Sequence, residues 1–362
     1  MDNIFRLSIL VLTLLSPIAA ANSPLSTANS TAEFDGPYVI TPTPSSQSTA
    51  YWVCNNKLKT TSVIAQQVKR PQSCGQLPQA TISAEIKQIM PDTYSGIKKV
   101  VALSDVHGQF DVLITLLTNQ KIIDDDGNWA FGDGHMVMTG DIFDRGHQVN
   151  EVLWFMYKLD QQARDAGGMV HLLMGNHEQM VLGGDLRYVH QRYDVAAKLL
   201  DRSYDKLYGA DTEIGQWLRS KNTIIKINDV LYMHGGISSE WISRNLTLAR
   251  ANKLYRQHVD ASKQSRKADE ELNFLFFGNG PTWYRGYFSE EFTETELDTI
   301  LNHFDVKRIV VGHTSQDRVL GLFNNKVLAV DTSIKKGQSG ELLLLENKQL
   351  TRGLYNGSRE DL

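Results

Sequence analysis

The chain has 362 residues, of which 41% are hydrophobic and 22% charged, a composition typical of globular proteins that bury a substantial core. Its 37 basic and 41 acidic residues give a formal net charge of −4, so no overall basic field points to nucleic acid or to an anionic membrane as a partner. This length accommodates one large domain with a small appendage, or two domains. Any partner must therefore be inferred from a site.

Residues 1–21 have the pattern of an export signal. Arg6 lies in a short n-region, residues 7–15 are apolar, and the run from Ala19 to Ala21 forms an A-x-A-like cleavage site. The apolar stretch is shorter than the roughly 18 residues that span a bilayer, although a single N-terminal anchor is the alternative. We therefore expect an exported chain, periplasmic or secreted (or in the endoplasmic reticulum lumen of a eukaryote), with no stable membrane insertion after signal cleavage.

Two segments precede the main domain. Residues 22–50 are rich in Ser, Thr, Pro and Asn, which predicts a flexible lead-in. Residues 51–95 predict a small N-terminal β subdomain, since "YWVCNNKLKTTSVI" alternates around an Asn-Asn turn typical of a hairpin. Cys54 and Cys74, the two cysteines of the chain, both fall there. In an exported protein such a pair indicates one disulfide, with two unrelated thiols as the alternative.

Residues 96–355 predict the main, α/β domain. The runs "KKVVALSD", "HMVMTGD" and "MVHLLMGN" predict buried strands, and helical spacing of apolar residues follows the first two, over 109–120 and 149–166. Strands that alternate with helices indicate an α/β architecture. Later apolar runs have shorter connections and predict a second sheet: "DVLYMHGG", "KRIVVGHT", "KVLAVDTS" and "ELLLLENKQL".

Polar side chains follow these strands. They are Asp105, His107, Asp141, Asp144, Arg145, Asn176, His177, His234 and His313. Ligands in open α/β sheets collect outside the carboxyl ends of the strands. Carboxylates, an amide oxygen and imidazoles suit divalent ions of the Mn, Fe or Zn type, and a carboxylate between two such ions can bridge them. The Arg145 fork fits phosphate oxygens. The pattern therefore predicts a two-metal site for phosphoryl chemistry.

Taken jointly, the motifs resemble those of the phosphoprotein phosphatase family of metallophosphoesterases. "SDVHGQFD", "GDIFDRG", "GNHE", "MHGGIS" and "VVGHT" match from Ser104 to Thr314, and "GPTWYRGY" is similar to the bacterial Shewanella-like branch. The resemblance implies a calcineurin-like β-sandwich flanked by helices. It also implies a reaction in which a hydroxide bridging two metal ions attacks phosphorus directly, without a phosphoenzyme.

The resemblance further implies a role for each matching residue. Asp105 and His107 would hold the first metal ion, and Asp141 would bridge the two ions. The second metal ion would be held by Asn176, His234 and His313. Phosphate binding is assigned to Arg145, Arg285 and Asn176, while His177, oriented by Asp144, would protonate the leaving oxygen.

The chain also departs from the family pattern. Ser104 replaces the usual Gly before the first Asp, and no segment matches the C-terminal "SAPNY" of the eukaryotic Ser/Thr phosphatases, which leaves their substrate preference and regulation open. Trp283, Tyr284 and Tyr287 flank Arg285. They suggest stacking on a phosphotyrosine ring, with packing in the core as the alternative.

The sequence thus predicts a metal-dependent phosphoprotein phosphatase acting on phosphotyrosine, phosphoserine or phosphothreonine of a protein or peptide, and not on nucleic acid. A nucleotide or dinucleoside-polyphosphate hydrolase on the same site is one alternative. A catalytically inactive phosphate-binding protein is another, although the complete set of ligands together with His177 argues against it. The identity of the two divalent ions, Mn, Fe or Zn, stays open.

Overall fold

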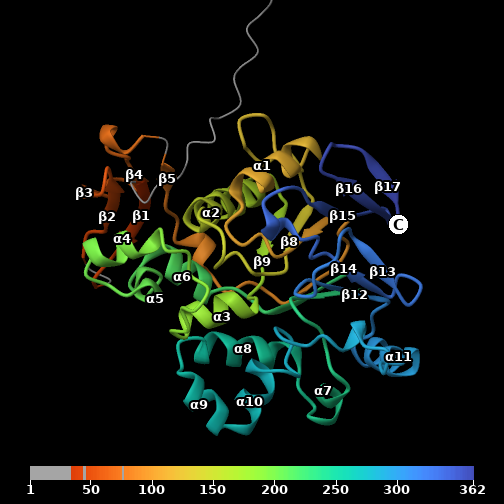
Figure 1. The fold of residues 1–362 in the computed structure, drawn as a ribbon. Helices are drawn as coiled ribbons and strands as arrows, with labels where there is room; N and C mark the ends of the chain where they lie inside the picture. Colours follow the sequence, from red (N-terminus) through yellow and green to blue (C-terminus); the bar gives the residue numbers. More distant parts are fainter. Residues whose placement is uncertain (1–33, 44–45, 76) are drawn as a thin grey trace, which may run out of the picture. The chain divides into compact units, whose positions relative to one another are not determined.

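The structure is a computed structural model that describes residues 34–43, 46–75 and 77–362 (Figure 1). These residues all fall within one compact unit. The predicted signal and the first part of the predicted lead-in lie outside the described residues. Within the described part, no helix is both long enough and apolar enough to cross a bilayer.

Two six-stranded sheets form the centre of the molecule. The first has the order β17-β16-β15-β7-β8-β9, built from Arg359–Asp361, Gln349–Leu354, Glu341–Glu346, Lys99–Leu103, His135–Met138 and Met169–Leu172. The second has the order β13-β14-β12-β11-β10-β6, built from Leu320–Leu322, Val327–Ala329, Arg308–Val311, Val230–Met233, Ile224–Ile227 and Thr93–Tyr94. The predicted α/β class and second sheet are confirmed. The placement of "ELLLLENKQL" in that second sheet is wrong, because β15 pairs with β7.

The sheets pack face to face, with helices outside. Successive side chains of a strand point to opposite faces, so β7 sends Val100 and Ala102 into the core between the sheets and Val101 and Leu103 toward the outer helices. The first sheet packs there against α1 (Phe110–Asn119) and α2 (Val149–Asp165). The outer core of the second sheet includes residues of α8 (Leu248–His258), α10 (Glu270–Phe276) and α11 (Glu294–Phe304). The central strands of each sheet are therefore buried on both faces.

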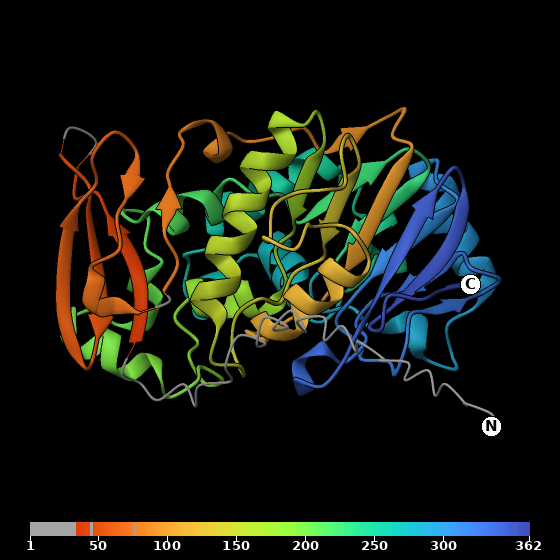
Figure 2. The same cartoon turned by 90° about the horizontal axis from the view of Figure 1, so that it is seen from above.

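A third sheet lies at one end of the described unit, beside α4 (Tyr193–Leu199), in both views (Figures 1 and 2). It contains β1 (Phe34–Ile40), β2 (Thr49–Cys54) and β3 (Lys57–Ser62), and the predicted hairpin joins β2 to β3. Asn55 and Asn56 take φ of 53° and 55°, as a tight hairpin turn requires. The Cys54–Cys74 disulfide is present.

Regular structure does not follow the predicted boundaries. Strand β1 lies inside the segment 22–50, because Tyr38, Val39 and Ile40 are buried rather than solvated. Strand β6 lies inside the predicted subdomain 51–95 but pairs with β10 in the main sandwich, and β17 continues to Asp361, beyond residue 355. The remaining elements are β4 (Gln67–Val68), β5 (Ala80–Thr81), α3 (Asn176–Leu182), α5 (Tyr204–Leu207), α6 (Glu213–Arg219), α7 (Ser239–Ser243) and α9 (Lys263–Ala268).

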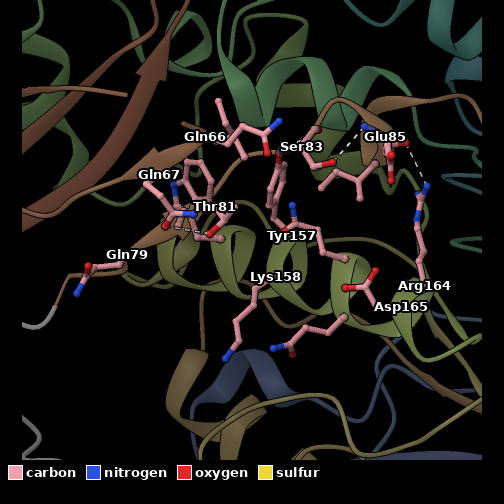
Figure 3. A pocket seen from close by; sticks show the side chains of 16 residues that line it. Gln66, Gln67, Gln79, Thr81, Ser83, Glu85, Tyr157, Lys158, Arg164 and Asp165 are labelled. Atoms are coloured by element: carbon pink, nitrogen blue, oxygen red, sulfur yellow. Dashed lines mark hydrogen bonds between the residues drawn. The ribbon is translucent and has the colours of Figure 1, made fainter. Parts of the chain in front are cut away.

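A cavity of about 520 Å³ lies between α2 and the segment around β5 (Figure 3). Its lining is rich in side-chain amides: Gln66, Gln67, Gln79, Gln161 and Gln162. The lining contains neither histidine nor cysteine. This cavity therefore lacks the histidines of the predicted chemical centre, which lies at the carboxyl ends of the strands.

A buried histidine pair lies on the first sheet, away from those strand ends. His171 Nε2 is 3.0 Å from His135 Nδ1, and the Tyr94 ring packs edge-on against both imidazoles. Burial lowers the pKa of His135 to about 4 and that of His171 well below its usual value. Both imidazoles are therefore neutral in the folded protein at neutral pH.

We expect this pair to destabilise the protein in acid. The unfolded chain protonates both histidines near pH 6.5, so the stability due to the neutral pair is present above about pH 6.5 and is lost as the pH falls toward about 4. At about pH 5 the cost for His135 is about 2 kcal/mol. Thermal unfolding of wild type and of His135→Gln/His171→Gln, compared at about pH 7 and about pH 5, checks this. An equal loss of thermal stability in both proteins would show that groups other than this histidine pair cause the acid sensitivity.

Candidate metal centre

The predicted site residues meet at the carboxyl ends of strands from both sheets. Asp105 follows β7, Asp141 follows β8, and Asn176 opens α3 after β9. From the second sheet, His234 follows β11 and His313 follows β12. All five are at least 96% buried, with exposed fractions of 4% or less. The sandwich thus brings together side chains that lie up to about 200 positions apart in the chain, as open α/β sheets do at their functional edge.

The backbone at this edge is strained. Six non-glycine residues have φ between 44° and 70°: Asp105, His107, Asp141, Asp144, Arg145 and His313. Such conformations persist only where the surroundings enforce them, and they cluster at functional sites. Here the loops hold one another, since the Asp105 amide donates to the Gly140 carbonyl and the His107 amide to the Asp141 carbonyl.

The Asp141 carboxylate lies at the centre of the cluster. Its Oδ2 is 3.2 Å from His234 Nε2, 3.5 Å from His107 Nε2 and 3.9 Å from His177 Nε2. Two groups of buried ligands share it: His107, Asp141 and His177 in one, and Asp141, His234 and His313 in the other. A carboxylate common to two ligand groups is what a bridging ligand between two cations requires.

The other two predicted metal ligands border this cluster. Asp105 Oδ1 is 3.7 Å from His107 Nε2, while its Oδ2 accepts hydrogen bonds from Ser104 Oγ and the His313 amide. Asn176 Oδ1 is 2.8 Å from His234 Nε2. All six predicted ligands therefore converge, although Asp105 belongs to neither group and His177 lies in the first.

The electrostatics of the cluster suit cations. Burial raises the pKa of the Asp141 carboxyl, but His234 and His177 outweigh it and hold the pKa well below its usual range. Burial lowers the pKa of His234, yet Asp141 and Asp105 raise it to about 9. The pKa of His313 shifts in the opposite direction to that of His234, because burial, His234 and Arg285 lower it to about 3. The carboxylates thus require positive charge beside them, which divalent cations supply.

The donor set fits two such ions. Two carboxylates, an amide oxygen and imidazole nitrogens are ligands for Mn, Fe or Zn, whereas an all-oxygen set would favour Mg or Ca. His107 Nδ1 lies 2.6 Å from the Phe143 carbonyl and His234 Nδ1 3.0 Å from the Thr139 carbonyl. These contacts orient the rings and leave both Nε2 atoms toward Asp141, as metal-ligating histidines require.

His177 and Asp144 form a close pair beside the cluster. His177 Nδ1 is 2.5 Å from Asp144 Oδ2, and its Nε2 points toward Arg145 Nη2, 3.3 Å away. Burial lowers the pKa of His177, but Asp141 and Asp144 together raise it above its usual value. Asp144 thus fixes the orientation of the imidazole, and the two carboxylates favour its protonated form, which a proton donor uses.

Two exposed guanidinium groups border the site. Arg145 Nε lies 3.3 Å from His107 Nε2, while Arg285 Nη1 donates to the His313 carbonyl at 2.7 Å and to Thr314 Oγ1 at 3.1 Å. A planar, always charged fork suits the oxygens of a phosphate. The predicted phosphate ligands therefore lie where solvent can reach them, next to the buried ligands.

Two residues that support the site were not predicted. The buried Glu178 carboxylate accepts hydrogen bonds from the Asp141, Ile142 and Gly175 amides at 2.7–2.8 Å, and so ties the β8 loop to the β9 loop. The signal was present as the Glu of "GNHE". Thr139 Oγ1 donates to Ser104 Oγ, which donates to Asp105 Oδ2, so the Ser that replaces Gly helps to orient the first Asp.

The aromatic residues are arranged differently from the prediction. Tyr287 is 2% exposed and packs in the outer core of the second sheet, so it cannot stack on a substrate ring. Trp283 lies at the site, with its ring centroid 5.9 Å from that of His313. Tyr188 was not predicted, because a single loop tyrosine has no pattern. It is 47% exposed, and its ring lies 5.6 Å from His177 and 5.7 Å from Arg145 Cζ.

A buried carboxylate shared by two ligand groups, a carboxylate-oriented histidine and two exposed arginines fit a metal-dependent phosphoesterase centre on an α/β sandwich. The chain belongs to the calcineurin-like phosphoesterase family, whose model matches residues 98–317, and within it to the Shewanella-like protein phosphatase branch.

The relatives share most of the chain. An uncharacterised protein of Schizosaccharomyces pombe is 31% identical, covering 71% of this chain and 81% of its own. Shewanella-like protein phosphatase 1 of Plasmodium berghei is 30% identical, covering 67% and 69%. A crystal structure of a cold-active protein-tyrosine phosphatase from a psychrophilic Shewanella species is 81% identical, covers 91% of this chain and 99% of that one, and superposes with a TM-score of 0.90.

Proposed function

We propose that this protein is a metal-dependent phosphatase of phosphoproteins and that phosphotyrosine is its preferred substrate residue. The observation that carries the proposal is the Asp141 carboxylate, which two groups of buried ligands share beside the His177–Asp144 pair. The 81% identical Shewanella protein, described as a protein-tyrosine phosphatase, supports both the reaction and the residue preference.

Different residues of the chain hold the metal ions, bind the phosphate and donate the proton in this proposal. Bound ions would neutralise phosphate charge and lower the pKa of water, and the residues placed to hold them are Asp105, His107, Asp141, Asn176, His234 and His313. Arg145 and Arg285 bind the phosphate oxygens from the exposed side. His177 Nε2 donates a proton to the leaving oxygen, while Asp144 fixes the ring through Nδ1.

An exposed ring beside this proton donor supports phosphotyrosine. The Tyr188 ring lies against His177, the proposed proton donor, and half-buried Trp283 lies near His313. A phenolic leaving group can stack on either ring, whereas a serine or threonine side chain offers no aromatic face.

We also propose that the protein acts after export. The Cys54–Cys74 disulfide supports this, because structural disulfides persist in oxidising compartments. The apolar run at residues 7–15, followed by an A-x-A-like site, points to the same route.

A substrate panel tests the proposed function. Protein stripped of metal and restored with Mn, Fe or Zn should hydrolyse phosphotyrosine peptides faster than matched phosphoserine and phosphothreonine peptides. Tyr188→Ala should lose more activity on phosphotyrosine than on phosphoserine, by about 10-fold if the ring stacks. Rapid turnover of a dinucleoside tetraphosphate alone would favour the nucleotide hydrolase. No turnover with any metal would favour a phosphate-binding protein.

A further inference from the structure

We propose that a basic pocket beside the metal centre binds a second anionic group, carboxylate or phosphate, on the same phosphopeptide substrate. This inference rests on the proposed function and extends it to the residues that flank the phosphotyrosine. The basic pocket has a volume of about 300 Å³ and is lined by residues of α3 and α9 and of the loops that follow α3 and α10. Its charged residues are Asp185, Arg187, Lys263, Arg266 and Lys267.

The basic pocket shares its wall with the metal centre. Trp283 lines the pocket, and its carbonyl oxygen lies 3.1 Å from His313 Nε2. Met180 also lines it, and its Sδ is 4.0 Å from Asn176 Nδ2. Arg187 precedes Tyr188, whose ring packs against His177. A peptide whose phosphate lies at the metal centre can therefore extend neighbouring side chains into this pocket.

The charge of the basic pocket is uncompensated. Asp185 neutralises Arg187 through two hydrogen bonds of 2.7 and 2.8 Å. Across the described residues, Lys263, Arg266 and Lys267 have no carboxylate within 4 Å. Arg266 is only 4% exposed, and its guanidinium donates to backbone carbonyls, including that of His258 at 3.0 Å. Three cations thus remain around one small volume, in a chain whose net charge is −4.

The arrangement of these cations favours a bound anion. Lys263 and Lys267 are four positions apart and exposed on α9, a spacing at which like charges repel. An oxyanion between them relieves that repulsion and gains charge-assisted hydrogen bonds. The field of Lys263 reaches Asp185, since the pKa of that carboxyl is held below its usual value first by Arg187 and further by Lys263.

The lining also contains apolar groups and one unused donor. The Trp283 indole N–H is buried and has no hydrogen-bond partner in the described structure. Lys267 Nζ lies 5.5 Å from the Phe277 ring centroid, which keeps the ammonium at the pocket wall. The volume suits a single Asp, Glu or phosphorylated side chain.

Matched phosphotyrosine peptides test this inference. In one set a single Glu is moved along the positions on both sides of the phosphotyrosine, with Gln in the partner peptides; in the other a phosphoserine replaces Ser. At the best position, the kcat/KM of wild type at low salt should be about 10-fold higher for the acidic peptide than for its neutral partner. This difference should become smaller as the salt concentration rises, because salt screens the contact. A gain with Glu identifies a carboxylate ligand, and a gain only with phosphoserine identifies a phosphate.

Charge reversal on α9 provides the variant. In Lys263→Glu/Lys267→Glu the loss of kcat/KM on the acidic peptide should exceed the loss on its neutral partner by about 10-fold or more. Lys263→Ala/Lys267→Ala should show a smaller loss in the same direction. Lys198→Glu, which reverses an exposed helical lysine on α4, should keep the wild-type preference.

Two results would refute anion binding by the basic pocket without refuting the proposed phosphatase activity. One is an equal kcat/KM of wild type for acidic and neutral peptides at every position. The other is a preference for the acidic peptide that persists in the charge-reversed variant. A wild-type protein that hydrolyses none of the phosphotyrosine peptides would instead refute the proposed function.

Discussion

Replacing His177 by Ala lowers kcat for phosphotyrosine peptides by about 100- to 10,000-fold, the range associated with a positioned general acid. Asp144 holds the imidazole at 2.5 Å, and Asp141 and Asp144 raise its pKa, which favours the protonated form that can supply a proton to the leaving oxygen. Steady-state kinetics of variant and wild type, with metal content matched, measures this loss.

The leaving group separates this role from a structural one. p-Nitrophenyl phosphate releases a stable phenolate that needs little protonation, so the His177→Ala loss should be much smaller on it than on phosphotyrosine. Asp144→Asn should reproduce the same pattern more weakly, because it removes the group that orients the ring. Equal losses on both substrates would show that His177 acts in metal binding or folding rather than as the acid.

Replacing Asp141 by Asn removes both metal ions and lowers activity by at least about 1,000-fold, since metal ions contribute several kcal/mol to such reactions. The amide keeps the size of the side chain but removes the charge that both ligand groups share. Metal analysis of the purified variant, together with kcat, checks the result.

Asp160→Asn is the matched control for this change. Asp160 is another buried Asp, paired with Lys221 at 2.7 Å and Arg164 at 2.9 Å, and it lies outside both ligand groups. Its replacement should cost about 3 kcal/mol of stability while the metal content stays at the wild-type level. An Asp141→Asn protein that retains both ions would contradict the shared-carboxylate assignment.

Local pattern in the sequence predicted the core of the site. Strands β7, β8 and β9 are short apolar runs that end in polar residues, and the carboxyl ends of parallel strands meet at one edge. Asp105, Asp141 and Asn176 were therefore expected to converge, and they do. His234 and His313 were also expected at the site, because each follows an apolar run in the same way.

The pairing of strands that are far apart in the sequence could not be predicted from local pattern. The run "ELLLLENKQL" predicts a hairpin, but nothing local shows which sheet it joins, and its pairing with β7 links positions more than 200 residues apart. Tyr188 and the basic pocket were missed for the same reason. Their residues come from separate loops and helices, so only the fold places Lys263 and Lys267 beside Trp283.

In the proposed function, two metal ions share Asp141 and are needed for the hydrolysis of phosphotyrosine. Titrating the metal-stripped protein with Mn, Fe or Zn, while following both bound metal and turnover of a phosphotyrosine peptide, tests it most directly. Activity should rise as two ions bind per chain, and Asp141→Asn should bind neither. Full activity with one ion, or without any, would contradict it.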